Sequence, residues 1–238
     1  MTSTTESRAA FIWSLKLFTR KYGFQGVDLD WEFPGPGDAA NFVSLVKEMR
    51  TSFGPSFGIS LTIPSDLGTE VYFDAKGMEP YVDSFGFMAY DQNTGSSVVH
   101  GHTDIADIET GASAIYASGV DMSKVVLGLA YYGRGFTLAD ASCAHEGCAA
   151  TQSIQDGACT ASGSESVLSL AEIKDVIKTK GLTPSIVDGA MYKQIVWDSQ
   201  WMGYDDEDTI ALKKSWASGK CFGGTMVWTT DFYNHGAI

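Results

Sequence analysis

Basic residues are scarce in this chain: 16 lysines and arginines stand against 29 aspartates and glutamates, and the formal net charge is −13. Binding to nucleic acid or to an anionic membrane surface needs clustered lysine and arginine. No apolar run approaches the roughly 18–20 residues that span a bilayer. The sequence therefore predicts that neither a nucleic acid nor a membrane is a partner.

Cysteine is scarce too, and three of the four cysteines lie within seventeen residues of a Gly/Ser/Ala-rich segment. No Cys-x-x-Cys pair occurs, and His145 is the one histidine among them, so we expect disulfides and an oxidising compartment rather than a zinc site. Four cysteines allow three pairings, and the sequence does not choose among them. The cysteines are Cys143, Cys148, Cys159 and Cys221.

No signal peptide is predicted from the given sequence either. The N-terminus, MTSTTESRAA, has no basic region followed by an apolar core. What the chain does have is 238 residues with 44% hydrophobic and 12% aromatic content, which is typical of one large folded domain or two small ones.

The hydrophobic pattern alternates between helical and strand periods, which favours an α/β fold with a parallel sheet. Residues 137–203 break this alternation and hold the three clustered cysteines. A closed (β/α) barrel needs eight strands, and five are predicted. Helices are predicted over 3–22, 38–50, 104–118, 169–180 and 205–217, and strands over 26–32, 57–63, 84–90, 125–130 and 224–229.

Three acids occupy every second position of the first predicted strand: Asp28, Asp30 and Glu32. A strand points alternate residues to one face, so these carboxyl groups would stand in a row. Like charges in a row are costly unless a proton is shared, a partner is near or the group does chemistry. The row is therefore our first candidate site; a solvated surface strand is the alternative.

Four motifs along the chain resemble those of glycoside hydrolase family 18, and in particular the fungal chitinases. The first family motif reads Asp-Gly-x-Asp-x-Asp-x-Glu, and here Gln25 replaces its first aspartate while the other acids remain. The segment from the cysteines through Tyr204 resembles the fungal form of an insertion between the seventh and eighth strands. The four motifs are Gln25–Glu32, Met88-Ala89-Tyr90-Asp91, Tyr132-Gly133-Arg134 and Met226-Val227-Trp228.

The resemblance implies a partial (β/α)8 TIM barrel of strands four to eight, with a small α+β insertion between strands seven and eight. The catalytic barrel domain would comprise 1–136 and 204–238, and the cysteine-bearing insertion 137–203. The family's first three βα units, with their Ser-x-Gly-Gly motif, have no counterpart in this sequence, so we expect an N-terminally truncated catalytic domain.

The resemblance also implies a substrate-assisted hydrolysis of β-1,4-linked N-acetylglucosamine, which departs from the usual two-carboxylate scheme. Glu32 would protonate the glycosidic oxygen, and neighbouring negative charge would keep its pKa high enough for that role. Asp30 would hold the acetamido N–H, Asp28 would share a proton with Asp30, and Tyr90 would orient the acetamido carbonyl. These four are the predicted catalytic residues.

Five further residues would bind the sugars. Asp91 and Arg134 would bind hydroxyls, Met88 and Tyr132 would line the cleft, and Trp228 would stack beneath a sugar ring, with a core tryptophan as its alternative. No cofactor and no metal is expected. The partner would be chitin or chitooligosaccharides, and the protein would be secreted, and a monomer if the chain is complete.

Three other functions stay open at this point. A non-catalytic chitin-binding lectin on the same fold typically lacks the acid that stands here as Glu32. An endo-β-N-acetylglucosaminidase acting on N-glycans shares the acidic motif. An inactive barrel fragment is the third alternative.

Two further clusters are interpreted as structural. His100 and His102 lie in a Gly/Ser loop without a third ligand, and we expect both to face solvent. The run Asp205 to Asp208 could suggest calcium, but it is more typical of a helix N-terminus, where acids cap the first turn.

Overall fold

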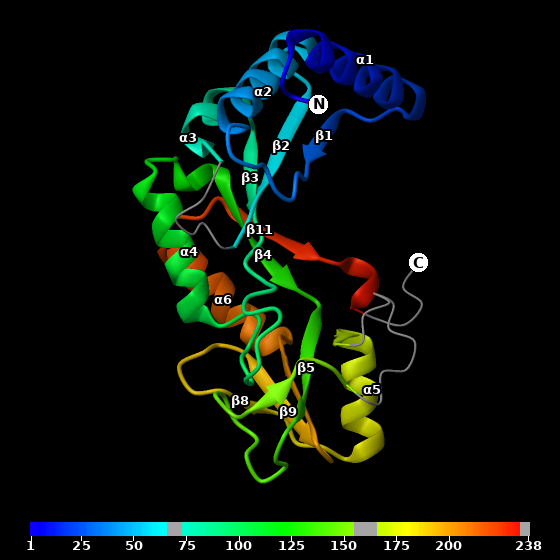
Figure 1. Cartoon of the computed structure of the whole chain (residues 1–238), viewed down its shortest axis with the longest axis vertical. Helices are drawn as coiled ribbons and strands as arrows, with labels where there is room; N and C mark the ends of the chain where they lie inside the picture. Colours follow the sequence, from blue (N-terminus) through cyan, green and yellow to red (C-terminus); the bar gives the residue numbers. More distant parts are fainter. Residues whose placement is uncertain (66–72, 155–165, 234–238) are drawn as a thin grey trace. The chain divides into compact units, whose positions relative to one another are not determined.

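The computed structural model describes residues 1–65, 73–154 and 166–233 (Figure 1). The chain divides into two compact units, and several elements run from one unit into the other. The first unit comprises Met1–Met88, Gly111–Val126 and Cys221–Gly224, and the second comprises Ala89–Thr110, Leu127–Lys220 and Thr225–Ile238.

The first unit is built on parallel strands: β1 (Gly26–Leu29), β2 (Gly58–Ile63) and β3 (Ser84–Phe87). In the register, Asp28 lies opposite Ser60 and Leu61 lies opposite Phe85. Every second residue of β2 is buried, so the other face of this strand is free to carry polar side chains. The helices are α1 (Thr5–Tyr22), α2 (Ala39–Phe53), α3 (Ala75–Met78) and the 3₁₀ turn η1 (Glu79–Tyr81).

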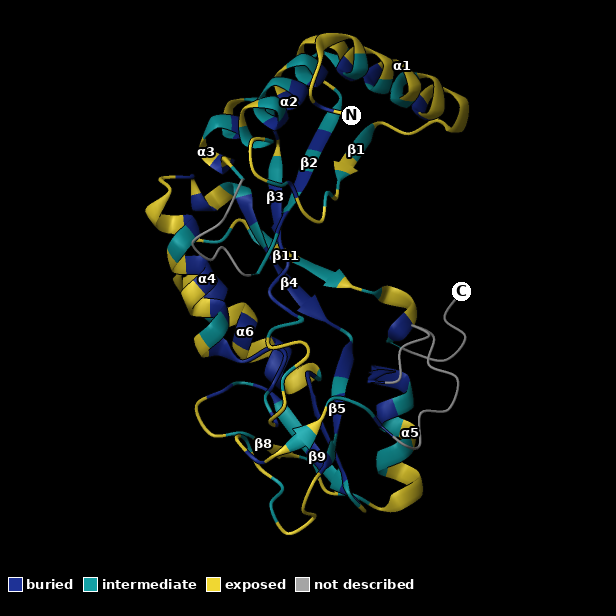
Figure 2. Ribbon diagram, viewed as in Figure 1, coloured by how far each residue is buried: buried dark blue, intermediate teal, exposed yellow. Residues whose placement is uncertain are grey.

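Helices α1 and α2 lie side by side, and Arg8 of α1 forms an ion pair of 2.8 Å with Glu48 of α2 (Figure 1). Four residues of α2, spaced as one helical face, are fully buried, as its periodicity predicts. Among the apolar residues of α1 only Ile12 is buried, and most of the helix surface is exposed (Figure 2). Phe18 packs instead against Tyr22 and Phe24 in an exposed aromatic cluster.

The five predicted strands are all present, and they form one sheet in the order β1-β2-β3-β4-β11. The last two are β4 (Val125–Ala130) and β11 (Gly224–Trp228), whose first residues belong to the first unit. The remaining helices outside the insertion are α4 (Ile105–Ala117), α6 (Glu207–Gly219) and the 3₁₀ turns η2 (Met122–Lys124) and η3 (Thr230–Phe232).

The second unit contains a separate antiparallel sheet, in the order β6-β5-β10-β9-β8, with β7 paired to β5. All five residues of its strand β10 are buried, and Trp201 packs there against Phe136 and Tyr192. The elements are β5 (Tyr132–Leu138), β6 (Ala150–Thr151), β7 (Val167–Ser169), α5 (Leu170–Lys180), β8 (Ser185–Ile186), β9 (Lys193–Trp197) and β10 (Gln200–Tyr204).

The α/β fold class and the α+β character of the cysteine-bearing segment thus agree with the sequence prediction. The barrel and the domain boundaries 1–136, 137–203 and 204–238 stay predictions. Among the described helices, none has the length and apolarity that a bilayer crossing requires.

The predicted disulfide is present. Cys143 is bonded to Cys148, while Cys221 is free and exposed. Cys159 lies outside the described residues.

Candidate active site

The acid row begins in β1 and continues beyond it. The strand was predicted over 26–32 but ends at Leu29, where its pairing with β2 ends. The alternation of exposed and partly buried residues continues beyond the residues that pair with β2. Asp28, Asp30 and Glu32 are exposed, while Val27 and the other intervening residues are partly buried. The three predicted acids therefore share an exposed side, as the spacing indicated.

Two hydroxyl groups of β2 hold the first two acids. Ser60 donates a short hydrogen bond to Asp28, and Thr62 donates to Asp30 Oδ1 at 2.8 Å. Both hydroxyls point to the face of β2 that is not buried, since Ile59, Leu61 and Ile63 occupy the other. These hydrogen bonds fix the directions of the two carboxyl groups.

These two hydroxyl residues were not among the predicted site residues. Their signal was available: Ser60 and Thr62 are the polar positions of the alternating strand 57–63. What the sequence could not supply was the register that places them opposite the acids.

Met88, predicted to line the sugar cleft, is buried at the end of β3 in the same unit. Its N–H donates to the carbonyl of Ile63 at 2.9 Å. Its place directly after β3, beside the end of β2, is therefore fixed by the backbone. Its predicted contact with a sugar stays a prediction.

Asp91 is the centre of a second group, which lies wholly within the second unit. Its Oδ1 accepts a hydrogen bond of 2.6 Å from the Tyr132 hydroxyl and one of 2.7 Å from Arg134 Nε. Tyr132 and Arg134 are alternate residues of β5, so the strand period places both on one face. Asp91 is therefore in direct contact with two other predicted binding residues.

The electrostatics of this group keep Asp91 ionised and Tyr132 protonated. Burial acts to raise the pKa of Asp91, but the basic side chains of His102 and Arg134 beside it lower the pKa well below its usual range. Burial raises the pKa of Tyr132 well above 10, and the negative charge of Asp91 adds to this effect. Asp91 is thus a fixed acceptor and Tyr132 a fixed donor near neutral pH.

His102 supports the group from inside the protein, and the expectation that it faces solvent is wrong. Its side chain is only 1% exposed. The Asp91 N–H donates to Nδ1 at 3.3 Å, and Nε2 lies 3.2 Å from the carbonyl oxygen of Tyr132. A carbonyl can only accept, so Nε2 carries a proton. Arg134, which stays charged at every accessible pH, acts with His102 to hold Asp91 ionised.

Two more predicted residues lie in this unit. Tyr90 is buried and packs edge-to-face against Tyr132, with ring centroids 6.1 Å apart. Trp228, at the end of β11, is 54% exposed, so its alternative as a core tryptophan is wrong. The carbonyl of Trp228 accepts from Tyr131 N–H at 2.8 Å, which ties the end of β11 to the start of β5.

The acidic run at the start of α6 is a cap, as predicted. Asp206 is the N-cap residue, and its side chain accepts from the N–H groups of Asp208 and Thr209. Asp205 is fully buried and forms an ion pair of 2.6 Å with the equally buried Lys213. These carboxylates thus have protein partners.

Comparison with known proteins places this geometry in a family. Residues 1–232 match the family model for glycosyl hydrolases family 18. The chain belongs to this family. The resemblance expected from the four motifs is therefore confirmed over nearly the whole sequence.

Curated family 18 relatives match almost all of this chain. A probable endochitinase of Caenorhabditis elegans is 28% identical over 260 residues, covering 98% of this chain and 41% of the nematode protein. Chitotriosidase-1 of Mus musculus is 29% identical over 258 residues, covering 97% of this chain and 54% of the mouse protein. The chain spans about half the length of these relatives.

A solved family 18 structure has the same fold. A chitinase from Cycas revoluta, solved in complex with allosamidin, aligns with a TM-score of 0.86 and 25% identity, covering 97% of this chain and 71% of the other. The α/β fold of this chain thus matches that of a family 18 chitinase.

Proposed function

We propose that this family 18 chain is a chitinase, which hydrolyses β-1,4 bonds between N-acetylglucosamine units with retention of configuration. The observation that carries the proposal is the acid row at the end of β1. All three acids are present, they share one exposed side, and neighbouring hydroxyls hold the first two. The chitinases among its relatives and the allosamidin complex of the cycad enzyme support the substrate class.

In the proposed mechanism, Glu32 donates a proton to the glycosidic oxygen as the bond to the anomeric carbon breaks. The substrate's own acetamido oxygen attacks that carbon and forms an oxazolinium ion. Glu32, now a carboxylate, takes a proton from a water molecule. This water opens the oxazolinium ring on the face that the leaving group left, so the configuration is retained. Asp30, held by Thr62, stabilises the acetamido N–H, and Asp28 supports Asp30.

The second group supplies binding and orientation. We propose that Tyr90 orients the acetamido carbonyl and that Trp228, whose side chain is exposed, stacks on a sugar ring. We also propose that Asp91 and Arg134 bind hydroxyls and that Tyr132 and Met88 each contact the sugar chain. The Asp91 contacts described above support this assignment, because they hold donor and acceptor in fixed directions.

Replacement of Glu32 tests the enzyme proposal. We expect Glu32→Gln to lower kcat on chitin oligomers by about 10²–10⁴-fold, the usual contribution of a general acid–base, while oligomer binding persists. Reducing-sugar release measures the first and calorimetry the second. The matched control is Glu109→Gln, because Glu109 forms an exposed ion pair with Lys220, which contributes little.

The same experiment separates the alternatives. If the unaltered chain releases no sugar but binds oligomers, the lectin-like function holds and the chitinase proposal fails. Release from N-glycans rather than from chitin would favour the endo-β-N-acetylglucosaminidase. A broad, non-cooperative melt by circular dichroism would favour the inactive fragment.

We further propose a secreted, fungal-type protein that acts as a monomer. The Cys143–Cys148 disulfide supports an oxidising compartment, and the cysteine-bearing segment resembles the fungal insertion. Light scattering tests the monomer.

A further inference from the structure

The disulfide loop 143–148 is bound to the segment that carries His100. Val99 N–H donates to the carbonyl of Cys148 at 2.8 Å, and Gly147 N–H donates to the carbonyl of Val99 at 2.9 Å. The pairing continues as an antiparallel bridge between Val98 and the residue after the disulfide. This backbone contact places Glu146, within the disulfide loop, beside His100.

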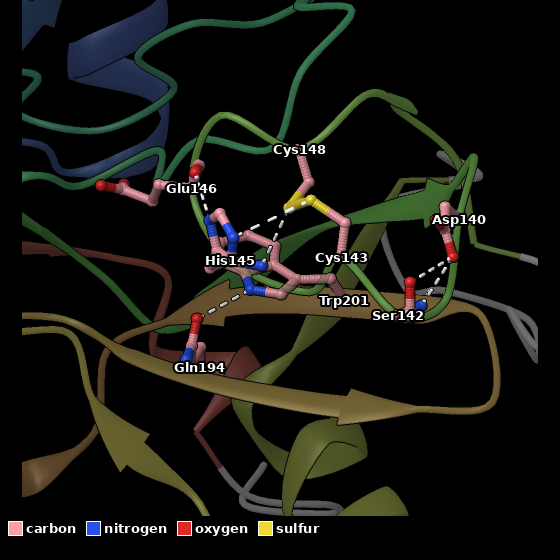
Figure 3. Close-up of a disulfide and its surroundings, with 8 residues drawn as sticks. All are labelled: Asp140, Ser142, Cys143, His145, Glu146, Cys148, Gln194 and Trp201. Atoms are coloured by element: carbon pink, nitrogen blue, oxygen red, sulfur yellow. Dashed lines mark hydrogen bonds between the residues drawn. A yellow bond between two sulfur atoms is a disulfide. The ribbon is translucent and has the colours of Figure 1, made fainter.

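The Glu146 side chain is fixed and points away from the two sulfur atoms (Figure 3). Its Oε1 accepts a 3.3 Å hydrogen bond from Gly101 N–H and a short one from the Tyr192 hydroxyl. The same oxygen lies 3.9 Å from His100 Nδ1. A Cβ at Gly101 would clash with the Tyr192 ring, so glycine at this position leaves room for the tyrosine beside the Glu146 carboxylate.

Asp104 approaches the same place from the start of α4 and is only 8% exposed. Its Oδ1 accepts from Ala106 N–H at 2.8 Å. Asp107, one turn on, lies 3.8 Å from His100 Nδ1. In residues 1–65, 73–154 and 166–233, no lysine or arginine forms an ion pair with Asp104, Asp107 or Glu146. Three carboxylates therefore lie near one imidazole without a direct ion pair to a lysine or arginine, although the buried Lys213 ammonium interacts electrostatically with Asp104.

The ligand atoms of His100, Asp104 and Glu146 all lie within 4.8 Å of one another. Imidazole and carboxylate together suit zinc and similar transition ions, whereas calcium and magnesium take oxygen ligands. We propose that His100, Asp104 and Glu146 bind a divalent transition-metal ion of the zinc class. Zinc–ligand distances are usually about 2.0–2.2 Å, so a bound ion would draw the three ligand atoms closer together than the 4.8 Å within which they lie.

The ion would act as a structural clamp. It would join three parts of the second unit that are distant in sequence: the loop 98–102, the disulfide loop and the start of α4. Its charge would add to that of Lys213 in compensating the buried Asp104. The site is independent of the proposed hydrolysis, and it revises the sequence expectation that no metal is bound.

Zinc binding by the full 238-residue chain tests the proposal. We expect calorimetry with Zn²⁺ to show one saturable site per chain, and we expect Zn²⁺ to raise the Tm. The buffer contains no reductant, because reduced Cys143 and Cys148 with His145 would form a rival ligand set. Mg²⁺ at the same concentration should not bind.

Two variants distinguish this site from incidental binding. His100→Gln should weaken zinc binding at least tenfold while leaving the Tm without metal unchanged, since the His100 side chain is partly exposed. His145→Gln is the matched control on the disulfide loop and should bind as the unaltered chain does. No saturable binding, or binding lost with His145→Gln but kept with His100→Gln, would overturn the proposal.

Discussion

At the scale of single residues, Asp91 carries an unusual number of constraints. One oxygen accepts from both Tyr132 and Arg134, while its own N–H donates to His102. Its φ of 60° lies in the left-handed region, which aspartate tolerates better than most residues. The backbone conformation and the side-chain bonds together fix the direction of this carboxylate.

Loss of the Arg134 cation should be visible in the pH dependence of stability. The folded-state pKa of Asp91 is depressed, so its contribution is present above the unfolded pKa near 4 and is lost as the pH falls through the folded value. We expect Arg134→Met to lower the free energy of unfolding by about 1–2 kcal/mol at pH 7, and the deficit to shrink below about pH 4.

Urea unfolding at pH 7, 5 and 3 measures this difference. Arg20→Met, at an exposed position of α1, is the matched control and should show no deficit at any of these values. A deficit for Arg134→Met that stays constant down to pH 3 would mean that lost packing, not the charge on Asp91, causes it.

At the scale of elements, the short disulfide loop is a local constraint. Cys143 and Cys148 are five residues apart, and closing so short a loop in the unfolded chain contributes about 2 kcal/mol in the chain-entropy model. The double variant Cys143→Ala/Cys148→Ala should lose that amount in urea unfolding. Cys221→Ser, which removes a free exposed thiol, should lose nothing.

Helix α6 is fastened to the end of β10 by a buried ion pair. Lys213 and Asp205 are each 1% exposed as side chains, and burial lowers the pKa of Lys213 while Asp205 opposes this shift. Lys213→Met would leave the Asp205 charge buried and unpaired, which typically costs about 3–5 kcal/mol. Lys214→Met, the exposed neighbour, should be neutral.

A double variant tests whether the unpaired charge of Asp205 causes the loss of stability. If the loss comes from an unpaired charge, adding Asp205→Leu to Lys213→Met should recover most of the stability, because two apolar side chains can replace a buried pair. Chemical denaturation of the four proteins gives the coupling energy. A double variant no more stable than Lys213→Met would show that the pair is needed for more than charge balance.

At the scale of the whole molecule, the strands and the long helices were predictable because each has its own period. The buried positions of β2 and α2 follow periods of two and of 3.6 residues. The acid row was predictable for the same reason, since its spacing is local. Helix α1 was predicted as well, but the exposure of most of its apolar residues could not be read from its sequence, because burial depends on what packs against the helix.

Contacts between distant segments were not predictable. Thr62 reaches Asp30 only through the β1–β2 register, and His102 reaches Asp91 only because residues 89–104 fold back onto β5. The proposed metal site shows the same limit. No third ligand is visible near His100 in the sequence, because the disulfide loop brings Glu146 to His100 only in the folded chain. Sequence spacing identifies such residues, but not their partners.

The net charge of −13 should itself limit stability. Most carboxylates of the chain repel one another at neutral pH, and salt shortens the Debye length from about 30 Å at 0.01 M to about 8 Å at 0.15 M. We expect calorimetry at pH 8 to show a Tm rise of about 2–4 °C over this range, which corresponds to roughly 1 kcal/mol. Near the pI of about 4.5 the repulsion is largely cancelled, so there the same salt should leave the Tm unchanged or lower it. A Tm that falls with salt at pH 8 would mean that attractive pairs such as Arg8–Glu48 outweigh the repulsion among the acids.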